Sequence, residues 1–169
     1  MGTTTDAERS MLLQYLQGQR SHVLGILEGL DEQALRRAVL PSGWSPVGLV
    51  NHLSVDVERF WFRAVVAGEA EVVDGVLSST ADGWQVDDAI PAAEVLATYR
   101  REIELADAIL ADASVEAKPA WWSEDLFGGW LVENVREVLL HVIAETACHA
   151  GHLDAARELL DGRLWLVLS

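Results

Sequence analysis

Apolar residues recur at the three- and four-residue spacing of an amphipathic helix in four long stretches, and no stretch alternates convincingly as a half-buried strand does. We predict helices over residues 6–30, 46–67, 91–113 and 131–160. The 169 residues are enough for one hydrophobic core and close to the usual size of one domain. Four long helices joined by loops predict an all-α fold, a four-helix bundle, in a single domain over residues 1–169.

Capping residues set the predicted helix boundaries. Asp6 is placed to cap the first helix. Ser45 and Pro46 have the residue types of an N-cap and a first helical position for the second helix, and Pro91 opens the third. The Asp-Gly pair ending at Gly162 is expected to close the fourth. The apolar face of the first helix is expected to consist of Met11, Leu12, Tyr15, Leu16, Val23, Leu24 and Leu27.

Two other segments lack sustained helical periodicity. Residues 68–90 are acidic and glycine-rich, and we expect a long loop there, because loops of this length are usually functional or mobile. Trp84 in this loop is a candidate for covering a site, whereas the other tryptophans are expected to pack at the bundle ends. The apolar tail, residues 163–169, is expected to pack on the bundle or to join a subunit interface.

Composition argues against several classes of function. The formal net charge of -15 repels a polyphosphate backbone, so we expect no nucleic-acid partner. No signal peptide and no apolar run of membrane-spanning length is visible, so we expect no membrane association and a cytoplasmic location. Cys148 is the single cysteine, which precludes an internal disulfide, and we expect it to pack in the core.

Polar side chains form a stripe along the last predicted helix. His141, Glu145, His149 and His152 follow one another at intervals of four, four and three residues, so their side chains share one face. Glu145 and His149 are a candidate pair of metal ligands. The alternative is a solvent-facing stripe in which the two make an ordinary ion pair, and this helix alone does not decide between them.

A histidine within the second predicted helix favours a metal. His52 lies among the apolar residues Val47, Leu49, Val50, Leu53 and Val57. Its ordinary partner is a carboxylate or a carbonyl, but a metal becomes the better one if His52 faces Glu145 and His149 across the bundle. Two imidazoles and one carboxylate leave coordination positions open, as in catalytic zinc sites. We predict Zn²⁺, with Ni²⁺ or Fe²⁺ as alternatives. Asp56, one turn later, either accepts a hydrogen bond from the imidazole nitrogen of His52 that does not bind the metal, or faces solvent.

Two segments carry a resemblance to a known family: GWSPVGLVNHLSVDVERFW, from Gly43, and VREVLLHVIAETACHAGHLDAARELLDG, from Val135. Together they resemble the DinB-like superfamily over residues 12–162, in the branch that includes actinobacterial mycothiol-dependent enzymes. The resemblance implies a four-helix bundle of DinB-like type with an open metal site, and it makes His52, Glu145 and His149 the ligands. Many members have a histidine at the position of Glu145. The glutamate resembles the variant in the N-terminal domain of mycothiol-dependent maleylpyruvate isomerase.

The resemblance also implies chemistry in which a metal activates a low-molecular-weight thiol. We expect a homodimeric mycothiol-type thiol S-transferase that acts on electrophilic small molecules. The isomerase has a second, C-terminal domain without a counterpart in these 169 residues, so we expect a stand-alone transferase or an uncharacterised relative. His152, Arg157 and Trp84 are the candidates for binding the thiol.

Two alternatives stay open at this point. One is a non-catalytic bundle that binds a metal, a small molecule or a partner. The other is a metal-dependent hydrolase, with Asp56 or Glu58 as candidate bases. His22 has no close partner at helical spacing, and we expect it on the surface.

Overall fold

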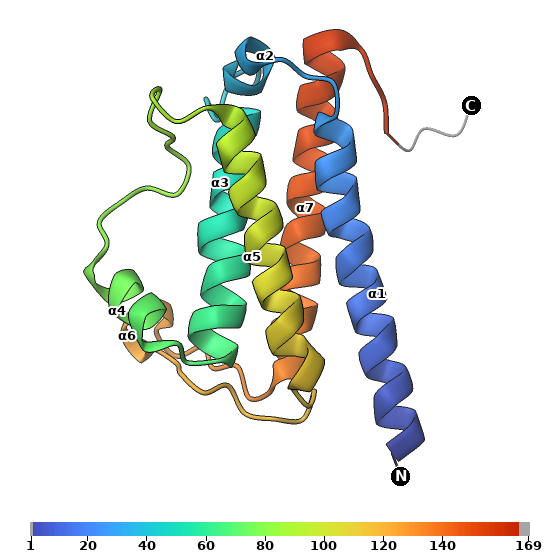
Figure 1. Ribbon diagram of the computed structural model, residues 1–169, viewed down its shortest axis with the longest axis vertical. Helices are drawn as coiled ribbons and strands as arrows, with labels where there is room; N and C mark the ends of the chain where they lie inside the picture. Colours follow the sequence, from blue (N-terminus) through green and yellow to red (C-terminus); the bar gives the residue numbers. More distant parts are fainter. Residues whose placement is uncertain (1, 166–169) are drawn as a thin grey trace.

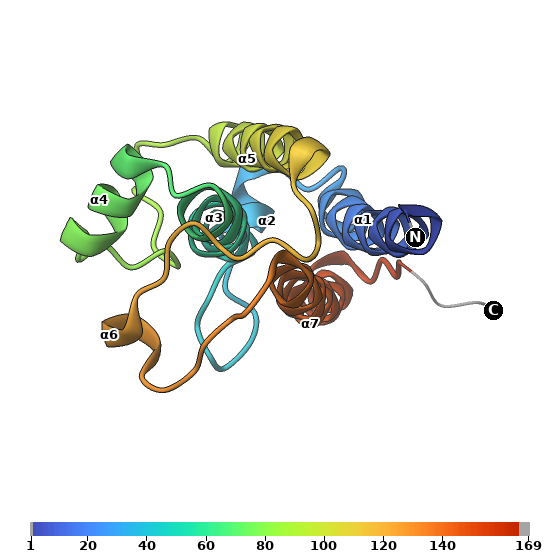
Figure 2. The same ribbon diagram turned by 90° about the horizontal axis from the view of Figure 1, so that it is seen from below.

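A computed structural model describes residues 2–165, and the side chains of residues 5–165. Four long helical segments form a bundle (Figure 1): α1 (Gly2–Leu27), α3 (Pro46–His52) continued directly by η1 (Leu53–Val66), α5 (Ala92–Asp112) and α7 (Val135–Asp161). Viewed from below in Figure 2, α1 lies beside α7, and α5 lies beside the α3–η1 helix. Residues 2–165 contain no β-strand, which confirms the predicted all-α fold.

The capping residues explain most of the helix boundaries. Ser45 caps α3 by accepting a hydrogen bond from the backbone N–H of Gly48 at 3.2 Å, and Pro46 follows it as expected. Gly162 ends α7 with a φ of +77°, a conformation that favours glycine. The predicted cap at Asp6 is wrong, because α1 already begins at Gly2. α7 begins later than predicted, at Val135.

The predicted apolar face of α1 is only partly buried. Leu12, Leu16 and Val23 lie in the core. Met11 and Tyr15 were expected there too, but their side chains are 51% and 60% exposed. They lie beside the buried positions in sequence, so helical spacing places them at the edge of the stripe.

Three short helices lie in segments without long apolar periodicity: α2 (Glu32–Arg36), α4 (Ala70–Ser78) and α6 (Glu124–Phe127). α4 corrects the prediction of a continuous loop over residues 68–90. It packs on η1, and its Val72 joins the core. A helix of nine residues shows only two turns of apolar spacing, which is too little to separate it from a loop by pattern alone.

The second long helix changes its winding at Leu53, where the hydrogen bonding becomes that of a π-helix. A π-helix bonds each residue to the fifth one along, so a turn holds more residues and the buried face departs from α-helical spacing. In η1 this face includes Glu58, whose side chain is 1% exposed. The guanidinium of Arg20 donates to both of its carboxylate oxygens, at 2.6 and 2.7 Å. Glu58 is therefore part of a buried ion pair, and its candidacy as a catalytic base is dropped.

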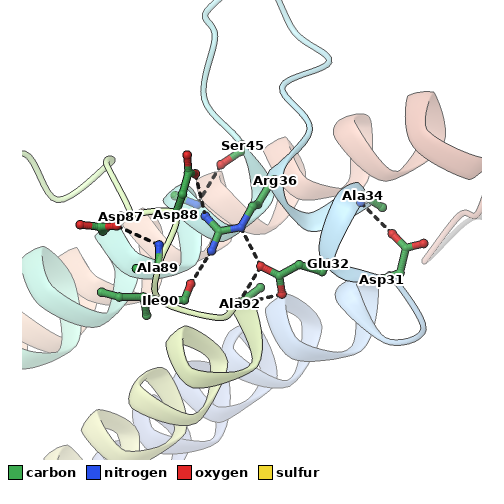
Figure 3. A network of polar contacts seen from close by, with 11 residues as sticks. Asp31, Glu32, Ala34, Arg36, Ser45, Asp87, Asp88, Ala89, Ile90 and Ala92 are labelled. Carbon is green, nitrogen blue, oxygen red and sulfur yellow. Dashed lines mark hydrogen bonds and ion pairs between the residues drawn. The ribbon is translucent and has the colours of Figure 1, made fainter.

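α2 anchors the segment that leads into α5 (Figure 3). The Glu32 carboxylate accepts hydrogen bonds from the backbone N–H of Ala92 at 2.9 and 3.1 Å, and so caps the first turn of α5. The Arg36 guanidinium donates to Glu32 at 2.6 Å and to the carbonyl oxygen of Ile90, and it lies 3.5 Å from Asp88. This network fixes the end of the connection that carries Trp84.

Among the described residues, no helix combines the length and the apolar character that crossing a bilayer requires.

Candidate metal centre

His52, Glu145 and His149 lie together where the end of α3 faces the middle of α7. One possible ligand atom from each residue lies within 4.8 Å of the other two. Oε1 of Glu145 is 3.0 Å from Nε2 of His149 and 3.7 Å from Nε2 of His52. The structure thus brings together the three residues that the sequence suggested as ligands.

The orientation of His52 leaves one ring nitrogen free for a ligand bond. Nδ1 lies 2.9 Å from Oδ2 of Asp56, and since an ionised carboxylate can only accept, Nδ1 carries the proton. Nε2 then presents its lone pair toward Glu145, buried and without a hydrogen-bond partner among the described residues. A buried polar atom without a partner is costly, and a cation between Nε2 and the carboxylate would satisfy it. The three side chains therefore fit a divalent metal.

The protonation state of His149 also suits coordination. Its side chain is 10% exposed, and burial lowers the pKa of the imidazole despite its contact with Glu145. A neutral imidazole is the form that binds metals, so this lowering of the pKa favours coordination. The His52 and His149 rings meet edge to face, with centroids 5.0 Å apart and planes at 74°.

The connection between α4 and α5 docks on the helix face that carries His52. The Trp84 indole stacks on the His52 imidazole, with centroids 4.3 Å apart and planes at 14°. The side-chain amide of Asn51 donates to the carbonyl oxygen of Gly83 at 2.8 Å. A Cβ built on Gly83 would overlap the Asp56 carboxylate. Trp84 thus covers His52 as the sequence suggested, and Gly83 is a contact that the sequence gave no reason to select.

The polar stripe of α7 extends beyond the three clustered side chains. His152 is exposed, and its Nδ1 lies 3.4 Å from Nδ1 of His149. The ring of Trp44 lies 6.2 Å from that of His152. Trp44 and Trp84 also line a small polar cavity of about 220 Å³, together with Arg36, Ser45, Gln85 and Asp88 among others.

At the other end of the stripe, His141 contacts tryptophans instead of the metal cluster. Its ring lies 4.4 Å from Trp61 and 5.2 Å from Trp130. These tryptophans, like Trp44, were expected only to pack at the bundle ends. The signal that links them to the site is the polar stripe of α7, because His141 and His152, which these tryptophans contact, share a helix face with Glu145 and His149.

A protein-family model for mycothiol S-transferases matches residues 11–162. The chain belongs to the mycothiol S-transferase family. The match agrees with the DinB-like resemblance and spans all three clustered side chains, together with Trp84. Searches of the curated proteins and of the solved structures gave no match.

Several residues singled out in the sequence of this mycothiol S-transferase family member lie elsewhere. The Arg157 guanidinium donates to the backbone oxygens of Ile26 and Glu28, at 2.7 and 3.0 Å, and to Asp161. Its donors are thus committed to the contact between α1 and α7, and we drop it as a thiol-binding residue. Cys148 is exposed, contrary to the expected core position, because it lies one residue off the buried face of α7.

The prediction for His22 is also wrong. Its side chain is only 13% exposed, and Nε2 lies 2.9 Å from both carboxylate oxygens of Asp154 on α7. The partner comes from another helix, which spacing within α1 cannot reveal. Trp165 stacks on the His22 ring at 5.4 Å, so this part of the tail packs on the bundle as expected, while residues 166–169 lie outside the described residues.

Proposed function

We propose that the protein is a metal-dependent S-transferase that joins a mycothiol-type thiol to an electrophilic small molecule, with His52, Glu145 and His149 as the metal ligands. The observation that carries the proposal is the unpartnered Nε2 of His52, which points toward Glu145 beside His149. The family match supports the thiol as co-substrate.

A divalent metal in this ligand set would supply the positive charge that keeps a thiol in its nucleophilic thiolate form at neutral pH. We propose Zn²⁺, with Ni²⁺ and Fe²⁺ as alternatives. In the reaction the thiol loses its proton to solvent and its sulfur forms a bond to the electrophilic carbon. The bond from that carbon to the leaving group breaks, and the leaving group departs with the electron pair.

The protein's own residues hold the reactants. Asp56 fixes the direction of the His52 ring through its Nδ1 hydrogen bond. Trp84 shields the same ring from water by stacking on it. His152 and the cavity beside Trp44 and Trp84 offer polar groups and indole faces, which suit a hydroxyl-rich thiol. His152 and Trp84 therefore remain in the proposed thiol site.

We propose that the chain lies near the branch that contains mycothiol-dependent maleylpyruvate isomerase, because position 145 is a glutamate. The metal-loaded protein is assayed with maleylpyruvate and mycothiol. Isomerisation of maleylpyruvate would support this assignment, whereas its absence would favour a transferase. The homodimer and the cytoplasmic location also remain predictions, of which sedimentation analysis tests the first.

The proposed ligand set is tested by metal content. We expect protein purified without added metal or chelator to contain about one Zn²⁺ per chain by plasma mass spectrometry, since three protein ligands hold one ion. His52→Ala and His149→Ala are expected to lose it while keeping the helical circular dichroism of the wild type. His141→Ala is the matched control, a histidine one turn from Glu145 that lies outside the cluster. Full metal occupancy in either ligand variant contradicts the assignment.

Transfer itself is tested separately. The metal-loaded wild type is expected to consume mycothiol in the presence of an alkylating electrophile and to yield the S-conjugate, detected by mass spectrometry. Loaded protein that forms no conjugate with any electrophile would leave a non-catalytic metal-binding bundle as the better account.

A further inference from the structure

Beyond the metal cluster, aromatic rings gather at the His141 end of the α7 stripe. Trp61 from η1, Phe127 from α6 and Trp130 from the segment before α7 meet with ring centroids 5.5 to 5.7 Å apart. His141 contacts the two indoles. We call these four side chains the aromatic surface. Figure 2 shows α6 on the side of α3 that is turned away from α5.

Of the four side chains only Trp130 is exposed, because Trp61 is buried and Phe127 and His141 are partly buried. The Trp130 side chain is 43% exposed, and two neighbouring leucines, Leu126 and Leu131, are 49% and 57% exposed. These three exposed apolar side chains lie within one short segment, and contiguous exposed apolar groups commonly mark a binding site. The indole is held in place by Trp61, Phe127 and His141, so a ligand would meet a preformed ring face.

The aromatic surface lies next to the proposed metal centre along α7. His141 precedes Glu145 by one helical turn on the same face of α7, which corresponds to a rise of about 6 Å. A planar molecule against Trp130 and His141 would therefore extend toward Glu145 without leaving the stripe. The opposite end, at His152, has the polar cavity beside Trp44. The two ends of the stripe thus differ in chemistry.

We infer that the electrophile has a planar aromatic body, and that this body stacks on the aromatic surface. This inference rests on the proposed function, because only a transferase would use the bound ligand as its electrophile. Aromatic rings that pack offset or edge to face gain more binding free energy than their buried area alone provides. The aromatic surface therefore favours a flat ring over a flexible alkyl chain.

Binding is tested first, without thiol, on the protein as purified. The probe is N-phenyl-1-naphthylamine, an uncharged aromatic dye that fluoresces in apolar surroundings. We expect saturable binding of about one dye per chain, with Kd raised at least tenfold in Trp130→Leu and no more than threefold in Trp130→Phe. The leucine keeps an apolar side chain, whereas the phenylalanine keeps a ring, so the pair separates stacking from general hydrophobicity. Leu159→Ala, at an exposed apolar position near the end of α7, is expected to leave Kd unchanged.

Transfer kinetics then identify the ligand as the electrophile. With 1-chloro-2,4-dinitrobenzene we expect Trp130→Leu to raise KM about tenfold, while KM for iodoacetamide, a small aliphatic electrophile, stays within twofold of wild type. Dye binding that behaves as expected in a protein without transfer activity would overturn the proposed function and leave an aromatic-ligand site. Active protein in which Trp130→Leu changes neither Kd nor KM would overturn the aromatic site and leave the function. A third outcome is that the wild type is an oligomer, that Trp130→Leu converts it to monomers, and that dye binding is unchanged. This result would assign the surface to self-association and would also overturn the aromatic site.

Discussion

Nδ1 of His52 lies 2.9 Å from Oδ2 of Asp56, one turn further along the same helix. The hydrogen bond sets both the tautomer and the direction of the imidazole, and it leaves Nε2 facing Glu145. Carboxylates that hold ligand histidines in this way tune metal affinity without touching the metal. Asp56 is therefore a positioning residue for the proposed centre.

Asp56→Ala is expected to weaken Zn²⁺ binding about 10- to 100-fold, because the His52 ring loses its fixed direction. Asp56→Asn keeps an acceptor but loses the charge, and is expected to lie between the alanine variant and wild type. Competition with a chromogenic zinc chelator measures the affinity. Asp74→Asn, an exposed position on α4, serves as control. Wild-type affinity in Asp56→Ala would show that the contact does not support the centre.

Gly83→Ala is expected to disturb the same contact from the opposite side. The added Cβ would overlap the Asp56 carboxylate, so either the carboxylate leaves His52 or the connection moves and lifts Trp84 from the imidazole. We expect metal affinity to fall by about tenfold, at the lower end of such effects. Gly75→Ala, where a Cβ meets no atom within 4 Å, is the matched control. If both variants bind metal like the wild type, the docked connection is not required.

The bundle and the three clustered side chains could be predicted because they depend on local spacing and on residue type. Helical periodicity identifies the four long helices, and capping residues such as Ser45 fix where α3 begins. Glu145 and His149 share a face by spacing alone. His52 joins them through the resemblance, since periodicity does not give the rotation of one helix against another.

The rest depends on contacts between segments far apart in the chain. Asn51 and Gly83 are 32 residues apart, and nothing in either segment marks the other as its partner. Arg20 and Glu58 are 38 residues apart, and the π-helical winding of η1 obscures the buried position of Glu58. The same limit applied to His22, whose partner Asp154 is 132 residues away.

Acid is expected to remove the stabilising effect of the ion cluster that Arg136 forms with Glu8 and Glu116. Arg136 on α7 donates to Glu8 on α1 at 2.6 and 2.9 Å, and to Glu116. These hydrogen bonds lower the pKa values of both carboxyls below the ordinary 4.5. Because the folded pKa values are depressed, the stabilisation is fully present above about pH 4.5 and is lost as the pH falls through the folded values.

Thermal unfolding measures this effect. At pH 7 the wild type is expected to have a higher Tm than Arg136→Gln, and the difference is expected to shrink steadily below pH 4.5. Arg101→Gln, on the exposed face of α5, controls for the loss of one positive charge. A Tm difference that stays constant from pH 7 to pH 3 would exclude the cluster as its source.

The buried pair of Arg20 and Glu58 makes the strongest prediction about stability. Both side chains are 1% exposed, and Arg20 also contacts Asp107 at 2.7 Å. Arg20→Met leaves the Glu58 carboxylate in the core without its partner, and is expected to lower the free energy of unfolding by about 3–5 kcal/mol in urea titrations. The double variant Arg20→Met/Glu58→Leu removes the stranded charge and is expected to recover much of that loss. Because neither residue reaches the metal cluster, the folded double variant should keep its metal. Loss of the metal in a folded double variant would return Glu58 to the candidate functional residues.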